Sequence, residues 1–477
     1  ALTPLMIASF QKHFGRQVAL LHSRLSQGER YEEWCRLITG EATIAVGARS
    51  AVFAPIKNLG IIIIDEEHER TYKQEETPRY RTHEVAAERC RIHNAHLLLG
   101  SATPSLETYR EALLGDCRLL ALSSRIGGKA MPAVEIIDMR RELKDGNKSM
   151  FSRSLYRSLQ ETMAEGKKAI IFLNRRGHST CVLCRECGHV MRCPFCDISL
   201  TYHSSGKKMI CHYCYYAADV PDLCPVCKSV YIRYFGTGTQ KVEAELLKYF
   251  PGTRVLRMDL DTTTRKNAHK KILMSFEKEG PAILVGTQMI AKGLDIPGVT
   301  LVGVIAADIG LNLPDFRAAE RTFQLLTQVS GRAGRGKEQG KVIIQTYAPE
   351  HYSIMMAKNH DFKGFYAQEI QFRKELDYPP FCSLLRLVLT SRNEEMLELA
   401  ALKLKENKKI FESSGLETLG PVPCPLGKKN KSYRWHMLFK GTDKELLRER
   451  GKICRDYIRD NFKNVTVSLD FEPYSML

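Results

Sequence analysis

Residues 59–68 have the sequence Leu-Gly-Ile-Ile-Ile-Ile-Asp-Glu-Glu-His, in which a short apolar run ends in three acids and a histidine. An apolar run without polar alternation predicts a strand buried on both faces, as in a parallel sheet. The acids then lie at the carboxyl end of the strand, where parallel-sheet enzymes place their sites. Taken alone, the run is equally consistent with an ordinary strand end followed by an acidic loop.

Other short apolar runs alternate with helical patterns over most of the chain, as an α/β fold requires. In the first lobe they lie at residues 43–46, 60–64 and 95–99. A second series lies at residues 168–173, 255–256, 282–285, 301–305 and 341–346. The pattern predicts two lobes with parallel sheets, of which the first is incomplete.

The composition divides the chain into five segments. We predict a first lobe at residues 1–122, a connector and the start of a second lobe at 123–180, a cysteine-rich insertion at 181–230, the rest of the second lobe at 231–350, and a separate α+β C-terminal domain at 351–477. Residues 123–150 are polar and contain two adjacent glycines, which indicates a connector. After residue 350 the chain becomes richer in Lys, Arg, Glu and aromatic residues, which indicates a separate domain.

The chain is strongly basic, with 71 Lys and Arg against 54 Asp and Glu and a net charge of +17. Such an excess suits a nucleic acid, because phosphate contacts supply most non-specific affinity. A merely basic protein is equally consistent with the charge alone. No run reaches the ~18 apolar residues of a membrane span and no signal peptide is visible, so we expect no membrane partner. The scattered cysteines outside the paired ones indicate a reducing, cytoplasmic location.

Eight of the cysteines form four Cys-x-x-Cys pairs, which are Cys184/Cys187, Cys193/Cys196, Cys211/Cys214 and Cys224/Cys227. Each pair presents two sulfurs to one metal, so tetrahedral zinc needs two pairs. We therefore predict two structural Zn²⁺ ions, each with four cysteine ligands and no open position for water. Disulfides are a weaker alternative, and iron–sulfur ligation is weaker still because its spacings differ.

The order of the pairs predicts which of them share a metal. Residues 197–203 and 208–210 resemble strands on either side of a Ser-Ser-Gly-Lys turn, which predicts a hairpin. The hairpin brings the second and third pairs together and leaves the first and fourth for each other, so the pairing is nested. Since four pairs complete both sites, the neighbouring histidines are expected on the surface: His189, His203 and His212.

The acidic run after residue 64 carries the side chains that nucleotide hydrolysis needs. Asp65 has the position of a carboxylate that holds Mg²⁺, and Glu66 can orient and deprotonate the attacking water. The later segment 100–105, Gly-Ser-Ala-Thr-Pro-Ser, follows another apolar run and could relay between nucleotide and nucleic acid. Alone, that segment is only a helix N-cap.

The second lobe carries complementary cations. Residues 328–336 have the sequence Gln-Val-Ser-Gly-Arg-Ala-Gly-Arg-Gly, in which Arg332 and Arg335 lie three apart, a pattern typical of arginine fingers. Upstream, the loop 285–295 offers three side chains to backbone phosphates: Thr287, Gln288 and Lys292. Besides Asp65 and the two arginines, we assign nucleotide contacts to Gly293, Asp295 and Gln328.

These motifs, in this order, resemble those of superfamily-2 helicases. The Asp-Glu-Glu-His run, the inserted cysteine pairs, the segment Gly236-Thr-Gly-Thr239-Gln240 and the Gly-Arg-Ala-Gly-Arg run more closely resemble the bacterial primosomal replication-restart helicases, the primosomal protein N′ family, over essentially the whole chain. The resemblance implies two RecA-like lobes with ATP and Mg²⁺ between them. It also implies an ATP-dependent 3′–5′ DNA helicase that unwinds abandoned forks and initiates primosome assembly.

The resemblance implies partners and a location as well. The partners are forked and single-stranded DNA, the single-stranded DNA-binding protein and other primosome proteins, and the location is the bacterial cytoplasm at the nucleoid. Residues 71–81 resemble the aromatic-rich loop of the family. In that loop Tyr72 and Tyr80 would stack on bases, while Lys73, Arg79 and Arg81 would meet phosphates. Ordinary loop anchoring is the alternative for the tyrosines.

A further nucleic-acid contact is expected in the C-terminal domain. The basic turn 427–431 precedes Arg434 and Trp435, a combination that suits single-stranded DNA or a fork arm. A solvated loop beside a core strand is an equally good interpretation.

One family feature is missing, because no Gly-x-x-x-x-Gly-Lys-[Ser/Thr] loop occurs in the 477 residues. Without that loop the β- and γ-phosphates lose their cradle. The family's amino-terminal DNA-end-binding domain is absent too, so we interpret the chain as an amino-terminally truncated fragment that hydrolyses ATP poorly. The alternative is a non-enzymatic, zinc-dependent DNA-binding scaffold, in which Glu66 and Arg335 would be hard to explain.

Overall fold

The computed structural model describes residues 4–22, 25–122, 131–173, 180–195, 198–203, 208–235, 238–259, 262–263, 268–287, 290, 298–334, 339–407 and 411–475. The chain divides into two compact units, Ala1–Leu119 and Leu120–Leu477. None of the described helices combines the length and the apolar character that crossing a membrane requires.

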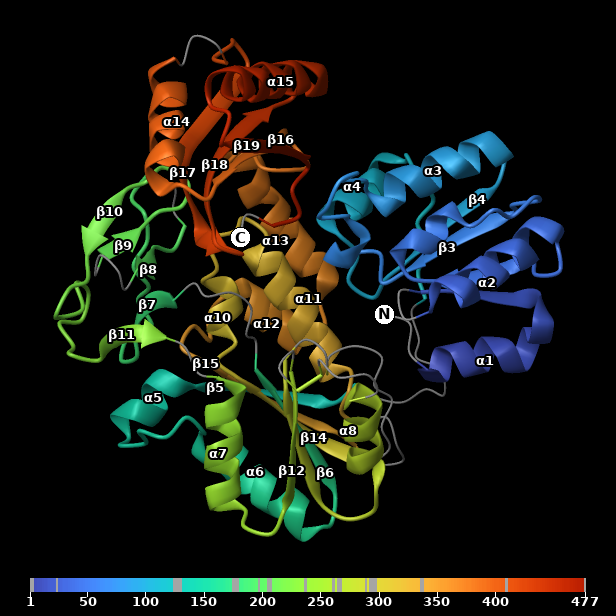
Figure 1. The fold of residues 1–477 in the computed structure, drawn as a ribbon. Coiled ribbons are helices and arrows are strands. Elements are labelled where there is room, and N and C mark those ends of the chain that lie inside the picture. The colour runs from blue at the N-terminus through green and yellow to red at the C-terminus, as the bar shows by residue number, and fades with distance from the viewer. Residues whose placement is uncertain are drawn as a thin grey trace. The chain divides into compact units, whose positions relative to one another are not determined.

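The described part of the first unit contains two pairs of parallel strands with helices between them (Figure 1). β1 (Val18–Leu21) pairs with β2 (Ile44–Gly47), and β3 (Ile61–Asp65) pairs with β4 (His96–Gly100). The helices are α1 (Pro4–Phe14), α2 (Gln27–Thr39), α3 (Thr82–His93) and α4 (Leu106–Leu114). The Ser26 and Ser105 hydroxyls accept hydrogen bonds from the first turns of α2 and α4. Such caps satisfy N–H groups that have no partner within the helix.

β3 is less buried than its apolar sequence predicts. Ile61 and Ile63 are 51% and 62% exposed, whereas Ile64 is 3% exposed. Successive side chains of a strand point to opposite faces. Among the described residues, Val52 and Ala86 pack with Ile64 in a small core, and the face that carries Ile61 and Ile63 has no such cover. The prediction of a strand buried on both faces is therefore wrong for the described chain.

The second unit contains a six-stranded parallel sheet with the order β12-β13-β6-β14-β15-β5. The strands are β5 (Ala133–Asp138), β6 (Lys168–Leu173), β12 (Arg254–Met258), β13 (Ala282–Gly286), β14 (Val299–Ile305) and β15 (Lys341–Thr346). The helices joining them are α5 (Met139–Lys144), α6 (Arg153–Ala164), α7 (Thr239–Tyr249), α8 (Ala268–Glu277), α10 (Asp308–Leu311) and α11 (Ala318–Ser330). Apolar side chains of α6 and α7 pack on one face of the sheet, around Leu155, Leu246 and Ile283. The predicted α/β fold with a parallel sheet is confirmed here.

The edge strand β5 lies within residues 123–150, where the sequence predicts a polar connector. Instead, Ala133 to Asp138 pair in parallel with β15 from Lys341 to Thr346. An edge strand has one neighbour, and five of the six β5 side chains are only half-buried. A weak apolar pattern is therefore sufficient for such a strand, and the connector prediction is wrong for these residues.

The cysteine-rich residues form a five-stranded sheet with the order β10-β9-β8-β7-β11, inserted in the chain between β6 and α7 (Figure 1). Its strands are β7 (Thr180–Cys184), β8 (Thr201–His203), β9 (Lys208–Ile210), β10 (Ala217–Asp219) and β11 (Ile232–Phe235). β8 and β9 pair antiparallel, with Thr201 opposite Ile210. This pairing is the hairpin that the sequence predicts between the second and third cysteine pairs.

The chain ends in a four-stranded antiparallel sheet with the order β17-β18-β16-β19. The strands are β16 (Ser383–Ser391), β17 (Leu416–Lys429), β18 (Ser432–Gly441) and β19 (Thr466–Phe471). The helices α12 (Tyr352–Lys358) and α13 (Phe362–Glu375) precede this sheet, and α14 (Glu394–Glu406) and α15 (Lys444–Asn461) pack against it. The predicted α+β C-terminal region is confirmed.

Candidate nucleotide site and candidate metal centres

The acids expected to handle the nucleotide lie at the carboxyl end of β3. Asp65 is the last residue of the strand and lies opposite Gly100 of β4. Glu66 follows with a φ of 48°, in the left-handed region, and its N–H donates to Asp65 Oδ1 at 3.0 Å. Non-glycine residues hold such a backbone only where their surroundings determine it. The geometry therefore places both carboxylates at the strand end that the sequence predicts.

His68 connects the acids to the Gly100–Ser105 segment. His68 Nδ1 lies 2.7 Å from Ser101 Oγ and 3.7 Å from the Glu66 carboxylate. Its side chain is 4% exposed. A buried polar group costs free energy unless it is hydrogen-bonded, so this contact links the two segments. The predicted relay between nucleotide and nucleic acid through residues 100–105 stays a prediction.

Glu67 carries a role that sequence reasoning missed. It is 1% exposed and accepts hydrogen bonds from Ser105 N at 2.6 Å and Thr108 Oγ1 at 3.1 Å, and it lies 3.3 Å from His83 Nε2. Burial alone would raise the pKa of Glu67, but His83 and the Ser105 N–H together outweigh burial and lower it. Glu67 thus holds the first turn of α4 and the start of α3 beside the acids. Its partners lie far away in the sequence, so no local signal identifies them.

The loop between the acids and α3 contains the predicted DNA-contacting residues. Tyr72 Oη donates to the Asp65 carbonyl at 2.7 Å, and burial followed by the nearby acids raises the pKa of Tyr72 to about 12. The Tyr80 ring meets the Phe53 ring edge-on, with 5.0 Å between the ring centroids. The Arg49 guanidinium lies 5.9 Å from the Tyr80 centroid. These contacts favour the anchoring alternative for both tyrosines in this conformation.

The three predicted cations of the loop differ in exposure. Lys73 is 5% exposed, whereas Arg79 and Arg81 are half-buried. Lys73 pairs with Arg81 through an isolated antiparallel backbone bridge, which closes the loop at its base. Contact of these cations with phosphate stays a prediction, and for Lys73 it requires the loop to move.

In the second unit, three of the predicted site residues lie in the described part of the chain: Thr287, Gln328 and Arg332. Thr287 directly follows β13, and Gln328 lies in the last turn of α11. Arg332 is half-buried in the turn after that helix. The other predicted residues of these loops lie outside the described residues: Gln288, Lys292, Gly293, Asp295 and Arg335.

The thiols of the insertion form two clusters. The sulfurs of the outer cluster all lie within 4.8 Å of one another and belong to Cys184, Cys187, Cys224 and Cys227. The inner cluster contains Cys193, Cys211 and Cys214, again within 4.8 Å, while Cys196 lies outside the described residues. The thiols are thus grouped in the nested order that the sequence predicts.

The sulfur separations fit a metal better than a disulfide. They are 3.6 Å for Cys184–Cys227 and for Cys187–Cys224, and 3.5 Å for Cys193–Cys214. A disulfide needs about 2.05 Å. A zinc tetrahedron with bonds of about 2.3 Å has sulfurs about 3.8 Å apart. Both described clusters therefore fit a tetrahedral thiolate-bound metal such as zinc.

His212 corrects another expectation. It is predicted on the surface but is 1% exposed. Its Nδ1 lies 3.0 Å from the Pro423 carbonyl, and its own carbonyl lies 2.8 Å from His436 Nε2. Both partners belong to the C-terminal sheet, more than 200 residues away in the chain. The prediction is wrong because this packing has no local sequence signal.

The predicted DNA residues of the C-terminal domain lie on β18. Trp435 packs partly against the C-terminal core, and its ring lies 6.1 Å from that of Tyr215 in the cysteine-rich insertion. Lys428 Nζ lies 4.3 Å from the Tyr433 ring centroid and donates to its hydroxyl at 3.0 Å. Arg434, which lies between Tyr433 and Trp435 in the sequence, is half-buried. Lys428 and Tyr433 are therefore adjacent, whereas Arg434 and Trp435, as successive residues of one strand, point to opposite faces of the sheet.

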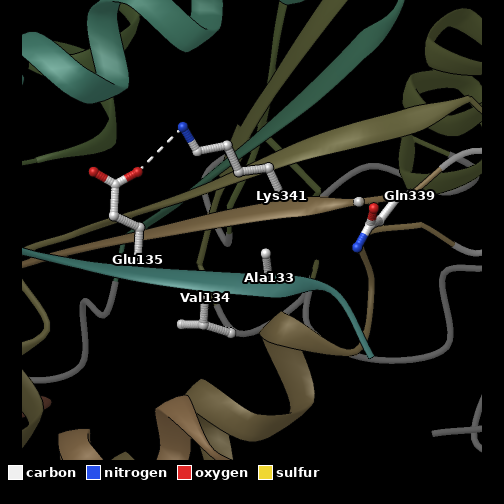
Figure 2. A pocket seen from close by; sticks show the side chains of 6 residues that line it. Ala133, Val134, Glu135, Gln339 and Lys341 are labelled. Carbon is white, nitrogen blue, oxygen red and sulfur yellow. Dashed lines mark ion pairs between the residues drawn. The ribbon is translucent and has the colours of Figure 1, made fainter. Parts of the chain in front are cut away.

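A pocket at the amino-terminal ends of β5 and β15 contains none of the predicted site residues (Figure 2). Lys341 Nζ pairs across it with Glu135 at 3.1 Å. Glu135 also accepts from Ser154 Oγ at 2.9 Å, and Lys341 donates to Ser158 Oγ at 3.1 Å. These polar groups therefore bind one another. They lie at the amino-terminal ends of the strands, whereas ligands of parallel sheets bind at the carboxyl ends, so we assign no ligand to this pocket.

Comparison with known families matches three parts of the chain. Residues 374–474 match the primosomal protein N C-terminal domain, and residues 193–218 match the Cys-rich region domain of the PriA DNA helicase. Residues 229–337 match the helicase conserved C-terminal domain. Among solved structures, that of RecG bound to a three-way DNA junction aligns with a TM-score of 0.39 and 16% identity, over 78% of this chain and 41% of RecG. That score is too low to support a functional statement.

Replication restart proteins PriA of several bacteria align with most of the chain. The Bacillus subtilis (strain 168) protein is 50% identical over 100% of this chain and 60% of its own length. The Synechocystis protein is 46% identical over 92% and 54%. The Treponema pallidum (strain Nichols) protein is 38% identical over 100% and 72%. The chain thus spans 54–60% of the first two relatives, and it belongs to the family of the replication restart protein PriA.

Proposed function

We propose that this chain forms the motor and metal-binding part of an ATP-dependent 3′–5′ DNA helicase that binds forked DNA and initiates primosome assembly. Family membership supports helicase action in replication restart in general. The observation that carries the finer proposal is the placement of Asp65 and Glu66 at the end of β3, joined through His68 to Ser101. A pure scaffold would have no use for this arrangement.

The proposed nucleotide chemistry assigns a role to each charged residue. Asp65 would hold Mg²⁺, and Glu66 would orient and deprotonate the attacking water. Arg332 and Arg335 would neutralise the charge that develops on the transferred phosphoryl group. Three further residues would contact the nucleotide: Gly293, Asp295 and Gln328. Bound Mg²⁺ would supply charge neutralisation at the phosphates.

The metal centres would have a structural role. Two Zn²⁺ ions with four cysteine ligands each leave no open position, so they would perform no chemistry. They would stabilise the insertion, which is too small to have a large core of its own. The matched Cys-rich family domain and the thiol clusters support this assignment.

The proposed partners are forked and single-stranded DNA, the single-stranded DNA-binding protein and other primosome proteins in the bacterial cytoplasm, at the nucleoid. DNA contacts would come from Thr287, Gln288 and Lys292 in the second unit and from Arg434 and Trp435 in the C-terminal domain. Tyr72, Lys73, Arg79 and Tyr80 would join them after a movement of their loop. The net charge of +17 supports a polyanionic partner.

The decisive experiment compares wild type with Glu66→Gln in the natural protein that contains these residues. We expect DNA-stimulated ATP hydrolysis and unwinding of forked DNA to fall by at least ~100-fold, because a positioned general base contributes about 10²–10⁴-fold. Glu32→Gln, an exposed change on α2, is the matched control and should retain full activity. A matched RNA duplex should not be unwound.

Two outcomes would contradict the proposal. If Glu66→Gln retains unwinding, Glu66 does not activate the water. If the wild-type protein binds forks but neither hydrolyses ATP nor unwinds DNA, the zinc-dependent scaffold is the better interpretation. Residues 1–477 alone are expected to hydrolyse ATP poorly, because they contain no Gly-x-x-x-x-Gly-Lys-[Ser/Thr] loop.

A further inference from the structure

The two thiol clusters have different neighbours in the second unit. The outer cluster lies beside the end of β15. Gly188, directly after the first cysteine pair, has a φ of 79°, and an added Cβ would lie 2.3 Å from the Tyr347 carbonyl. Arg185 Nε donates to Tyr347 Oη at 3.1 Å, and Leu183 packs with Met139 and Tyr347. The outer cluster is therefore seated on the parallel-sheet lobe.

The inner cluster contacts the C-terminal sheet through the residue between its ligands. His212 lies between Cys211 and Cys214 and donates from Nδ1 to the Pro423 carbonyl of β17 at 3.0 Å. The His212 carbonyl accepts from His436 Nε2 of β18 at 2.8 Å. The turn from Cys211 to Cys214, here called the knuckle, thus exchanges hydrogen bonds with two neighbouring strands of another domain.

Arg386 fixes the direction of these hydrogen bonds. Its Nε donates to His436 Nδ1 at 2.9 Å, so Nδ1 is the acceptor and Nε2–H is the donor toward His212. His212, His436 and Arg386 are 1%, 3% and 4% exposed. Breaking one of these bonds leaves a buried polar group without its partner, which costs more than an exposed hydrogen bond.

The surrounding apolar core also joins the two domains. Cys211 and Tyr213 of the knuckle pack in one cluster with Leu384 and Leu438 of the C-terminal sheet. The His212 carbonyl belongs to the Cys-x-x-Cys turn, so its position depends on the geometry of that turn. A bound metal closes such a turn, because both of its sulfurs ligate the same ion.

We propose that the inner cysteine site locks the C-terminal sheet to the cysteine-rich insertion through His212 and His436, while the outer site mainly anchors the insertion to the parallel-sheet lobe. The inference rests on the proposed zinc ligation. Loading of the inner site and docking of the C-terminal domain are then one coupled equilibrium, and each strengthens the other. Within the described chain, Cys184 and Cys224 of the outer site share an apolar cluster with Leu384 and Leu438, but no hydrogen bond like those of His212 joins the outer site to β17 or β18.

The test measures zinc content and hydrogen exchange for Cys214→Ser and Cys227→Ser, two matched ligand changes in the whole chain. Cys214→Ser should leave about one zinc per chain. It should speed exchange of residues 422–438 at least ~10-fold and leave residues 341–352 unchanged. Cys227→Ser should also leave about one zinc but should speed exchange of residues 341–352 instead.

His436→Leu tests the coupling from the other side without touching a ligand. It removes the donor to the His212 carbonyl, so release of one of the two zinc ions to a chelator should become at least ~10-fold faster. His436→Gln, whose amide can still donate from a similar position, should release zinc at nearly the wild-type rate.

The outcomes separate the two proposals. A wild-type chain that holds fewer than two zinc ions refutes the proposed metal centres, and the coupling with them. Two bound zinc ions, with the same exchange pattern for both cysteine changes or with unchanged release in His436→Leu, refute the coupling alone.

Discussion

Glu67 is an unusual residue in the candidate nucleotide site because its carboxylate is buried yet charged. The Ser105 N–H, the Thr108 hydroxyl and the His83 ring all lie within 3.3 Å of it. Asp65 and Glu66, next to it, lie at the carboxyl end of β3. The acidic run therefore combines two residues available for chemistry with one that holds the surrounding helices.

We predict that Glu67→Gln weakens the start of α4 by about 2 kcal/mol at neutral pH, because hydrogen bonds to a charged group contribute about 1.5–3 kcal/mol. Folding lowers the pKa of Glu67 from its ordinary value of 4.5. The charged carboxylate therefore stabilises the fold fully at pH values above 4.5. That contribution is lost as the pH falls through the lowered pKa. Hydrogen exchange of residues 106–110 as a function of pH measures it.

The control for this change is Glu88→Gln, an exposed carboxylate on α3 paired with Arg91. It should alter exchange at α4 by less than ~0.5 kcal/mol, as surface substitutions usually do. If Glu67→Gln exchanges like wild type at pH 7, the carboxylate does not hold α4.

At the scale of elements, α11 and α13 are joined by a buried charge cluster. Arg373 of α13 lies 3.0 Å from Glu320 of α11 and 2.8 Å from Glu369, and its side chain is 2% exposed. It also donates to the Pro379 carbonyl at 3.1 Å and lies over the Phe316 ring at 4.7 Å. The helix that leads to Arg332 is thus held against the helix that leads into the C-terminal domain.

We predict that Arg373→Ala destabilises the packing of α11 on α13 by about 3–5 kcal/mol, because two buried carboxylates would lose their partner. Urea unfolding of the second unit, followed by limited proteolysis between α12 and α13, measures the loss. Arg392→Ala removes an exposed arginine just after β16 and is the control. Equal unfolding midpoints for the two variants would rule out a structural role for the charge cluster.

At the scale of the whole molecule, the charge of +17 dominates the expected interaction with DNA. The described basic residues include Lys428 and Arg434. When such cations contact DNA phosphates, they release the counterions that were condensed on the DNA. Association should therefore weaken steeply with salt, whichever fork is used.

We predict that affinity for forked DNA falls by about 10³-fold or more between 50 and 200 mM salt if six or more phosphates are contacted. Fluorescence anisotropy of a labelled fork at several salt concentrations measures the slope. Lys428→Ala should reduce the slope of log affinity against log salt concentration by about 1, as expected for the loss of one phosphate contact. A flat salt dependence would show that base stacking, and not phosphate contact, supplies the affinity.

The cysteine spacing and the apolar runs were sufficient to predict much of this molecule. The nested clusters follow from the Cys-x-x-Cys pairs and the intervening hairpin, because a turn of this length leaves few possible neighbours. The position of Asp65 at the end of β3 follows from the apolar run before it. These features depend on short-range geometry, which a sequence encodes directly.

Other features were decided only by tertiary structure. β5 joins the sheet because β15 offers it a free edge, and Ile61 and Ile63 stay exposed because the described chain places nothing over them. His212 and Glu67 are buried by partners remote in the sequence. Hydrophobic patterns report burial of a whole face, whereas a single polar side chain is buried wherever a distant group can satisfy it, and that choice is made only when the chain folds.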